Sequence, residues 1–129
     1  MTKPLPTESQ EQQALFEWAA YAQGKYPELA LMLAIPNGGH RHKATAGRLK
    51  AEGVKAGVPD IMLPVARCGY HGLFIEMKRA SGGKLSQDQK RWLDELYAQG
   101  YACVVCTSWE TAKKHIEQYL DEHMLAREV

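Results

Sequence analysis

Three charged residues interrupt otherwise apolar segments of the sequence. Asp60 directly follows the tripeptide GVP, and Glu76 and Lys78 stand two residues apart in the segment LFIEMK, residues 73–78. An unpaired charge is costly in a buried strand, so these side chains must either face water or meet a compensating group. Because side chains alternate along a strand, Glu76 and Lys78 share one face with Phe74.

The segments 60–65 and 72–78 are both predicted to be strands, joined by a short turn. If they pair as antiparallel neighbours, their outer ends meet and Asp60 lies near Glu76 or Lys78. Carboxylate oxygens suit hard divalent ions, and Mg²⁺ needs only one or two of them together with water. A metal held there would polarise a phosphoryl oxygen and generate hydroxide, while Lys78 would position the water or stabilise charge on phosphorus. The simpler alternative is an exposed Glu–Lys pair, with Asp60 capping a turn.

Hydrophobic periodicity and breaker residues predict the elements that position these side chains. Helices are expected at residues 7–23, 40–52, 86–99 and 109–125, and strands at 30–35, 60–65, 72–78 and 101–107. The order α-β-α-β-β-α-β-α predicts an α/β fold in which helices flank a central four-stranded mixed sheet. The last strand is expected to lie parallel to the one before it, after a right-handed crossover.

Length, composition and charge narrow the classes of protein to consider. The 129 residues, 45% of them hydrophobic and 24% charged, suit one globular domain spanning residues 1–129. The formal net charge of +1 means that any surface that attracts nucleic acid must be local. No apolar run is long enough to span a membrane and the N-terminus has no signal-peptide core, so we expect a cytoplasmic protein without a membrane partner.

The cysteines allow two interpretations. Cys103-x-x-Cys106 has the spacing of a redox or zinc half-site. It lies in the apolar segment YACVVC, residues 101–106, and no second pair of ligands follows it. Buried core thiols in a reducing compartment, Cys68 included, are therefore favoured.

A basic segment lies between the first predicted strand and Asp60. Its cations, set against the acid Glu52, are Arg41, Lys43, Arg48, Lys50 and Lys55. Along one side of a helix such cations would contact DNA phosphates, which positions DNA without reading its sequence. The preceding loop, Asn37-Gly38-Gly39, lets a backbone come close to a ligand, and its amides suit an anion. The alternative is a solvated helix face.

The pairing of Pro59-Asp60 with Glu76-Met77-Lys78 resembles the PD-(D/E)xK nuclease superfamily. Within it, the sequence is most similar to the VRR-NUC (virus-type replication-repair nuclease) domain family, in its stand-alone phage or bacterial form. The resemblance covers residues 8 to about 120, and its matching stretches are IPNGG at 35–39, LKAEGVKAGVPDIMLP at 49–64, GLFIEMK at 72–78, GGKLSQDQ at 82–89 and GYACVV at 100–105. It implies a restriction-endonuclease-like sandwich.

The resemblance also implies a DNA nuclease that depends on Mg²⁺ or Mn²⁺. Asp60 and Glu76 fall on the family's metal ligands, and the carbonyl of Met77 on a further ligand. Lys78 falls on the family's catalytic lysine. Gln89 falls on a catalytic glutamine, although Ser86-x-x-Gln89 is equally a helix capping box.

The family carries a further glutamate on its first helix, followed by a glutamine. Glu8 with Gln12 fits that place best, as a metal ligand, and Glu11 is the alternative. Either acid could instead be a solvated first-turn residue favoured by the helix dipole.

We therefore expect a metal-dependent DNA endonuclease of DNA repair that is selective for branched DNA structures. Stand-alone members of the family resemble Holliday-junction resolvases, whose paired cuts need two active sites, so a homodimer is expected. The alternatives are a non-catalytic DNA-binding domain of the same fold and a flap or end nuclease. No nucleotide cofactor is expected, and the setting is a bacterial or phage-infected cell. The apolar residues considered for a dimer surface are Leu29, Leu31, Met32, Tyr70, Tyr119, Met124 and Leu125.

Overall fold

The computed structural model describes residues 4–36 and 43–123, with only the backbone described at residues 43 and 44. The elements follow the predicted order, with one 3₁₀ helix added after the first α-helix. They are α1 (Glu8–Ala22), η1 (Pro27–Leu31), β1 (Leu33–Ala34), α2 (Lys43–Ala51), β2 (Ile61–Leu63), β3 (Leu73–Met77), α3 (Gln87–Ala98), β4 (Ala102–Cys106) and α4 (Trp109–Leu120). No helix in this described part of the chain is both long and apolar enough to cross a membrane.

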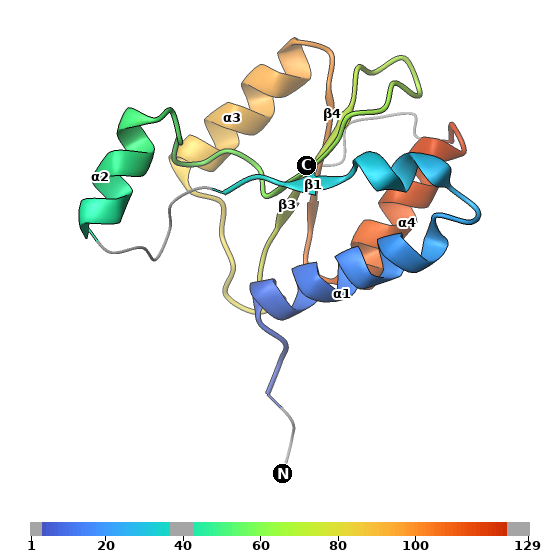
Figure 1. Ribbon diagram of the computed structural model, residues 1–129, viewed down its shortest axis with the longest axis horizontal. Helices are drawn as coiled ribbons and strands as arrows, with labels where there is room; N and C mark the ends of the chain where they lie inside the picture. The colour runs from blue at the N-terminus through green and yellow to red at the C-terminus, as the bar shows by residue number, and fades with distance from the viewer. Residues whose placement is uncertain (1–3, 37–42, 124–129) are drawn as a thin grey trace.

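The strands form one mixed sheet in the order β1-β2-β3-β4. β2 pairs antiparallel with both β1 and β3, and β3 pairs parallel with β4. Figure 1 shows α1 and α4 on one side of the sheet and α3 on the other. The predicted α/β class, the four-stranded mixed sheet and the parallel last pair are therefore confirmed.

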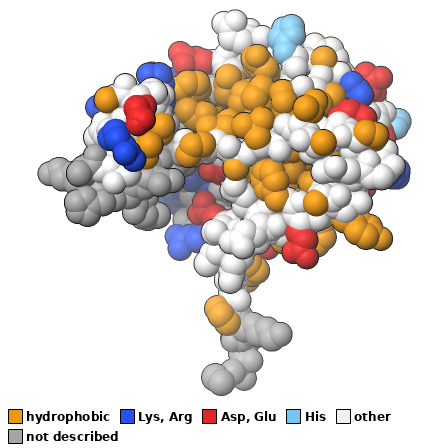
Figure 2. Space-filling view, viewed as in Figure 1, with side chains coloured by type: hydrophobic (Ala, Val, Ile, Leu, Met, Phe, Trp, Pro, Cys, Tyr) orange, Lys and Arg blue, Asp and Glu red, His pale blue; other side chains and the backbone are white. Residues whose placement is uncertain are grey.

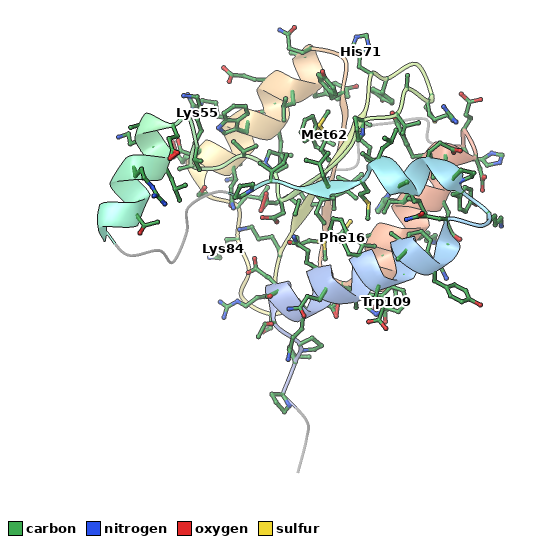
Figure 3. All side chains as sticks on the ribbon, viewed as in Figure 1. Phe16, Lys55, Met62, His71, Lys84 and Trp109 are labelled. Carbon is green, nitrogen blue, oxygen red and sulfur yellow. The ribbon has the colours of Figure 1, made fainter. Side chains whose placement is uncertain are left out.

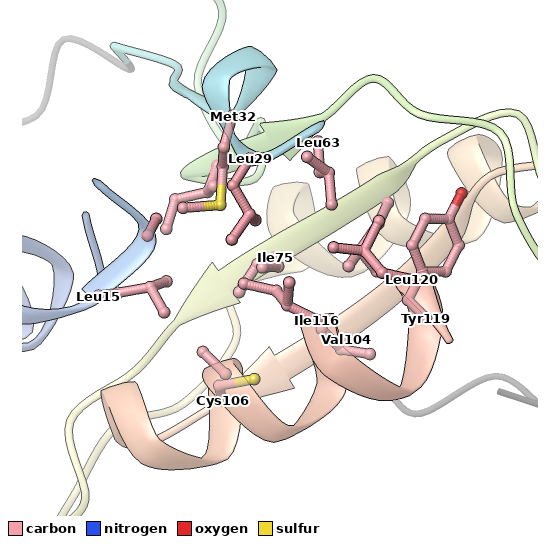
Figure 4. Close-up of a cluster of buried hydrophobic side chains, with 14 of the residues drawn as sticks. Leu15, Leu29, Met32, Leu63, Ile75, Val104, Cys106, Ile116, Tyr119 and Leu120 are labelled. Carbon is pink, nitrogen blue, oxygen red and sulfur yellow. The ribbon is translucent and has the colours of Figure 1, made fainter. Parts of the chain in front are cut away.

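Alternation along the strands divides the core into two clusters. Ile61, Ile75 and Val104 face α1 and α4, where they pack with residues such as Leu15 and Ile116 (Figure 4). Phe74 and Cys103 face α3 and pack with Leu93. Burial of such side chains is the main stabilising contribution to the fold, at about 25 cal/mol per Å² of apolar surface.

Cys103 and Cys106 lie on opposite faces of β4 and are both buried, in different core clusters. Burial raises the pKa of the Cys106 thiol to about 12, which makes it a poor nucleophile and a poor metal ligand. The structure thus favours core thiols over a redox or zinc half-site.

The strand predicted at residues 30–35 is mostly wrong. Pro27 begins a 3₁₀ helix, in which Leu29 N–H donates to the Tyr26 carbonyl at 3.0 Å and Met32 N–H to the Leu29 carbonyl at 3.2 Å. This three-residue spacing buries Leu29 and Met32 together, whereas a strand would have buried alternate residues. Only Leu33–Ala34 pairs with β2.

Burial also corrects the residues considered for a dimer surface. Leu29, Met32 and Tyr119 lie in the core and offer no free surface. Leu31 is 54% exposed and Leu33, which the sequence did not single out, is 43% exposed. Met124 and Leu125 lie outside the described residues, and the last helix ends at residue 120 rather than 125.

Candidate functional site

Asp60 stands immediately before β2, where the chain emerges from the buried Pro59. The pairing of Ile61 with Ile75, continued by one residue, brings Asp60 opposite Glu76, which is one of the two neighbours that the sequence allowed. The Asp60 Oδ2 atom accepts a hydrogen bond from the Met77 backbone N–H at 2.8 Å. This bond fixes the meeting ends of β2 and β3.

Glu76 is the charged residue of β3 and is only 2% exposed. Its Oε1 atom accepts a hydrogen bond from Gln89 Nε2 at 3.2 Å, whereas Oε2 is buried and has no hydrogen-bond partner within residues 4–36 and 43–123. Burial in a medium of low dielectric, followed by the neighbouring Asp60 carboxylate, raises the Glu76 pKa to about 9. Two ionised carboxylates at this place therefore require a positive charge that the surrounding chain does not fully supply.

Gln89 forms the capping box that the sequence allowed, and its side chain also reaches the acid site. Its amide oxygen accepts a hydrogen bond from Ser86 N–H at 2.8 Å, and the Ser86 hydroxyl accepts one from Gln89 N–H at 3.1 Å. This capping box begins α3. The amide nitrogen of the same side chain faces the site and binds Glu76, so the cap holds the carboxylate in place.

Lys78 follows β3 and is half-buried. Its backbone N–H donates to the Cys106 carbonyl at 2.9 Å, which continues the β3–β4 pairing beyond Met77. The ammonium acts on Glu76 by lowering its pKa, against the larger effects of burial and Asp60. A partly exposed cation that acts on the buried Glu76 carboxylate is also available to a reacting group that approaches from solvent.

The first helix carries two acids that the sequence considered for the site, and the two lie in different surroundings. Glu8 is half-buried and its charge contributes to the raised pKa of Glu76. Glu11 instead accepts a hydrogen bond from the Trp109 N–H at 2.7 Å, at the N-terminus of α4. Gln12 lies one turn beyond Glu8 and is half-buried. Glu8 is thus the acid of the first helix whose charge acts on Glu76.

A hard divalent ion fits the chemistry of this site. Among the described residues the Glu76 Oε2 atom has no hydrogen-bond partner, and this atom, the adjacent Asp60 carboxylate and the raised Glu76 pKa all favour binding of a cation. No group of three or more His, Cys, Asp or Glu side chains in the described part of the chain is arranged to hold a metal alone. Two carboxylates with water and a backbone carbonyl are nevertheless a donor set that Mg²⁺ accepts.

The cationic residues expected to bind DNA are only partly described. Asn37, Gly38, Gly39 and Arg41 lie outside the described residues, as does the side chain of Lys43. Arg48, Lys50 and Lys55 are exposed, and Arg48 Nε lies 3.7 Å from Glu52 Oε1 in a solvated pair. Figure 1 shows α2 standing apart from the sheet, and Figure 2 shows charged side chains in the recess between it and the main body.

The loop between α2 and β2 is anchored on α3 by contacts that sequence reasoning missed. Trp92 Nε1–H donates to the Ala56 carbonyl at 3.1 Å. Gly57 has a φ of +90°, and a Cβ there would lie 2.7 Å from Asp88 Cβ and 2.8 Å from its backbone carbon. Only glycine readily combines a positive φ with this lack of space for a Cβ. The close approach of Gly57 to Asp88 therefore fixes the course of the chain that leads to Asp60. The glycine within a breaker-rich loop was the available signal, but its partner on α3 was not.

An α/β sandwich with two carboxylates at the meeting ends of antiparallel strands is a nuclease-like arrangement. The family model of the VRR-NUC domain matches residues 6–110, and the chain belongs to this nuclease-type family. A solved structure described as a VRR_NUC domain protein is 28% identical in sequence to this chain, and the two superpose with a TM-score of 0.78. The match covers 98% of this chain and 95% of the chain in that structure. No protein with a curated description matches. The resemblance is confirmed, and it implies DNA as substrate and the general use of divalent metals.

Proposed function

We propose that this protein is a divalent-metal-dependent endonuclease that hydrolyses DNA phosphodiester bonds. The observation that carries the proposal is the buried Glu76 carboxylate beside Asp60, with Oε2 unpartnered among the described residues and a pKa raised to about 9. A buried acid with only a structural role would destabilise the fold. An acid that binds Mg²⁺ or Mn²⁺ has its negative charge compensated by the bound ion.

The residues divide the work in a way that follows from their surroundings. Asp60, Glu76 and the Met77 carbonyl hold the ion, and Glu8 adjusts its surroundings from α1. A bound divalent ion polarises a phosphoryl oxygen and lowers the pKa of a coordinated water. Lys78 orients the attacking water and stabilises the negative charge that develops on phosphorus.

Gln89 keeps the Glu76 carboxylate in one orientation through the 3.2 Å hydrogen bond from Nε2. Because its other end is fixed by Ser86, the glutamine cannot turn away without loosening the start of α3. Preorganisation of this kind limits the reorganisation needed during the reaction.

The cations of α2 and the loop after it supply contacts to DNA phosphates. Arg48, Lys50 and Lys55 are exposed on the element that stands away from the main body. With Arg41, Lys43 and the Asn37-Gly38-Gly39 loop, they would position a duplex by its backbone. These contacts carry no sequence information, which favours selectivity for DNA structure over a long recognition site.

Branched DNA in repair, such as a four-way junction, is the proposed substrate, and a homodimer in a bacterial or phage-infected cell is the proposed form. One chain carries one acid site, and symmetric resolution needs two cuts in opposing strands. A twofold dimer supplies both sites. The exposed Leu31 and Leu33 are available for its interface.

The test is incubation with labelled linear, flap and four-way DNA in Mg²⁺, Mn²⁺ or EDTA, with Asp60→Asn as the inactive control. The proposal predicts metal-dependent cleavage, paired nicks in the four-way DNA, and light scattering at about twice the 14.5 kDa chain mass. A folded protein that binds DNA but never cuts it would support the non-catalytic alternative. Single nicks by a monomer at flaps or ends would support a flap or end nuclease.

A further inference from the structure

A hollow of about 460 Å³ opens between α2, the following loop and α3. Its size lies within the range of sites that hold small organic groups. Figure 3 shows Lys55 where α2 faces α3. Residues that matter for its chemistry are Leu49, Lys50, Val54, Lys55, Arg91 and Trp92.

The lining of the hollow has an apolar part and a positively charged part. Leu49, Val54 and Trp92 are half-buried and give the hollow an apolar and aromatic wall. Three exposed cations surround it, against one acid, Asp88, which lies 3.8 Å from Arg91 in an exposed pair. An apolar wall with a cationic rim matches a nucleotide, which offers a flat base and a phosphate.

Whether a nucleotide is base-paired decides whether it can contact both the apolar wall and the cations of the hollow. In a duplex the phosphates are available to Lys50, Lys55 and Arg91, but each base face is covered by its stacked neighbours. An unpaired nucleotide exposes its base, and stacking or apolar contact with a side chain then adds affinity. The wall formed by Leu49, Val54 and Trp92 should therefore bind unpaired DNA more tightly than paired DNA.

The hollow adjoins the acid site along two paths. Trp92 lies three residues beyond Gln89 on α3, which is about 4.5 Å along a helix axis, and Gln89 binds Glu76. The Ala56 carbonyl, which accepts the Trp92 indole N–H, lies on the loop that leads into Asp60. A nucleotide in the hollow would thus belong to a strand that continues toward the carboxylates.

We propose that this hollow binds one unpaired nucleotide of the DNA substrate, with its base against the Leu49–Val54–Trp92 wall and its phosphate among the cations. The inference rests on the proposed function for its choice of DNA. It narrows the proposed branched substrate to branches with an unpaired nucleotide next to the cut, such as a flap or a junction whose central base pairs have opened.

The test compares binding of a blunt duplex with binding of the same duplex carrying a short single-stranded tail, by fluorescence anisotropy in EDTA. Leu49→Glu places a carboxylate in the hollow, and Ala51→Glu places the same charge on the exposed side of the same helix. The wild type should prefer the tailed DNA by about tenfold. Leu49→Glu should abolish that preference, whereas Ala51→Glu should weaken both DNAs equally and keep it.

A second variant guards against misfolding of Leu49→Glu. Val54→Ser removes part of the apolar wall without adding a charge, and it should weaken binding of tailed DNA more than binding of the duplex. Equal affinity of the wild type for both DNAs, or an unchanged preference in Leu49→Glu and Val54→Ser, would overturn the inference. Because no metal is present, these outcomes are independent of cleavage, which is what tests the proposed function.

Discussion

Gln89 donates a hydrogen bond from its side-chain amide to Glu76 across 3.2 Å while its other end caps α3. The cap of α3 and the acid site are therefore linked through a single side chain. A change at Gln89 affects both, and a second capping box elsewhere in the chain makes the two effects separable.

Replacement of Gln89 by alanine should lower both stability and cleavage. Loss of the cap costs about 1 kcal/mol of unfolding free energy, and loss of the bond to Glu76 should reduce cleavage about 10- to 100-fold. Gln10→Ala is the matched control, because Gln10 forms the same capping box with Thr7 at the start of α1. It should lose similar stability and keep full cleavage. Equal cleavage by both variants would show that Gln89 is only a cap.

The raised pKa of Glu76 makes the stability of the metal-free protein depend on pH. The folded carboxyl has a pKa of about 9, against an ordinary glutamate pKa of 4.5, so the folded state binds the proton more tightly. This contribution to stability is fully present below the unfolded pKa and is lost as pH rises toward the folded one. Glu76→Gln stays neutral, so it should melt above the wild type at about pH 8, and the gap should close as the pH falls toward 4.5. Thermal melts across pH in EDTA measure this, and parallel curves for the two proteins would contradict it.

The close approach of Gly57 to Asp88 should make this position intolerant of a side chain. Gly57→Ala must move Asp88 or the loop and should lose roughly 1–3 kcal/mol of unfolding free energy, with a fall in cleavage because Asp60 and Gln89 shift apart. Gly53→Ala is the control, since Gly53 has a φ of +100° and open space where a Cβ would lie. It should lose only about 1 kcal/mol. Equal losses in denaturant melts would show that backbone conformation alone matters.

The cations of the basic segment, residues 41–55, should contribute to DNA affinity through contacts with phosphates. Arg41→Ala and Arg48→Ala should each weaken binding to all sequences alike and flatten the log–log salt dependence by about 0.9. Lys114→Ala is a suitable control, because Lys114 is exposed on α4, away from α2 (Figure 1). Anisotropy titrations at several salt concentrations report the slope. Slopes equal to that of the control would reassign α2 as a solvated face.

The sheet and the pairing of its acids were predictable because they follow from local patterns. Alternation around Glu76 and the turn before Leu73 were enough to bring Asp60 near Glu76 or Lys78, and the register of β2 with β3 selects Glu76. The 3₁₀ helix at Pro27 was not predicted, because an apolar run does not by itself distinguish spacings of two and three.

Contacts between distant segments set the limit of the prediction. Gln89 has a side chain with two polar ends, and only the fold shows that both are used. The burial of Tyr119 and the contact of Gly57 with Asp88 likewise depend on partners far along the chain. Local sequence carries no signal for such partners.

The most direct test of the account is calorimetric titration of Mn²⁺ into the protein at about pH 7.5, in two buffers that differ in ionisation enthalpy. The account predicts one ion bound per chain with release of a proton from Glu76, and no binding by Asp60→Asn or Glu76→Gln. Lys78→Ala should bind the ion normally yet cleave DNA about 10²- to 10³-fold more slowly. Undiminished binding by both acid variants, or binding without proton release, would contradict the claim that Asp60 and Glu76 form the metal site.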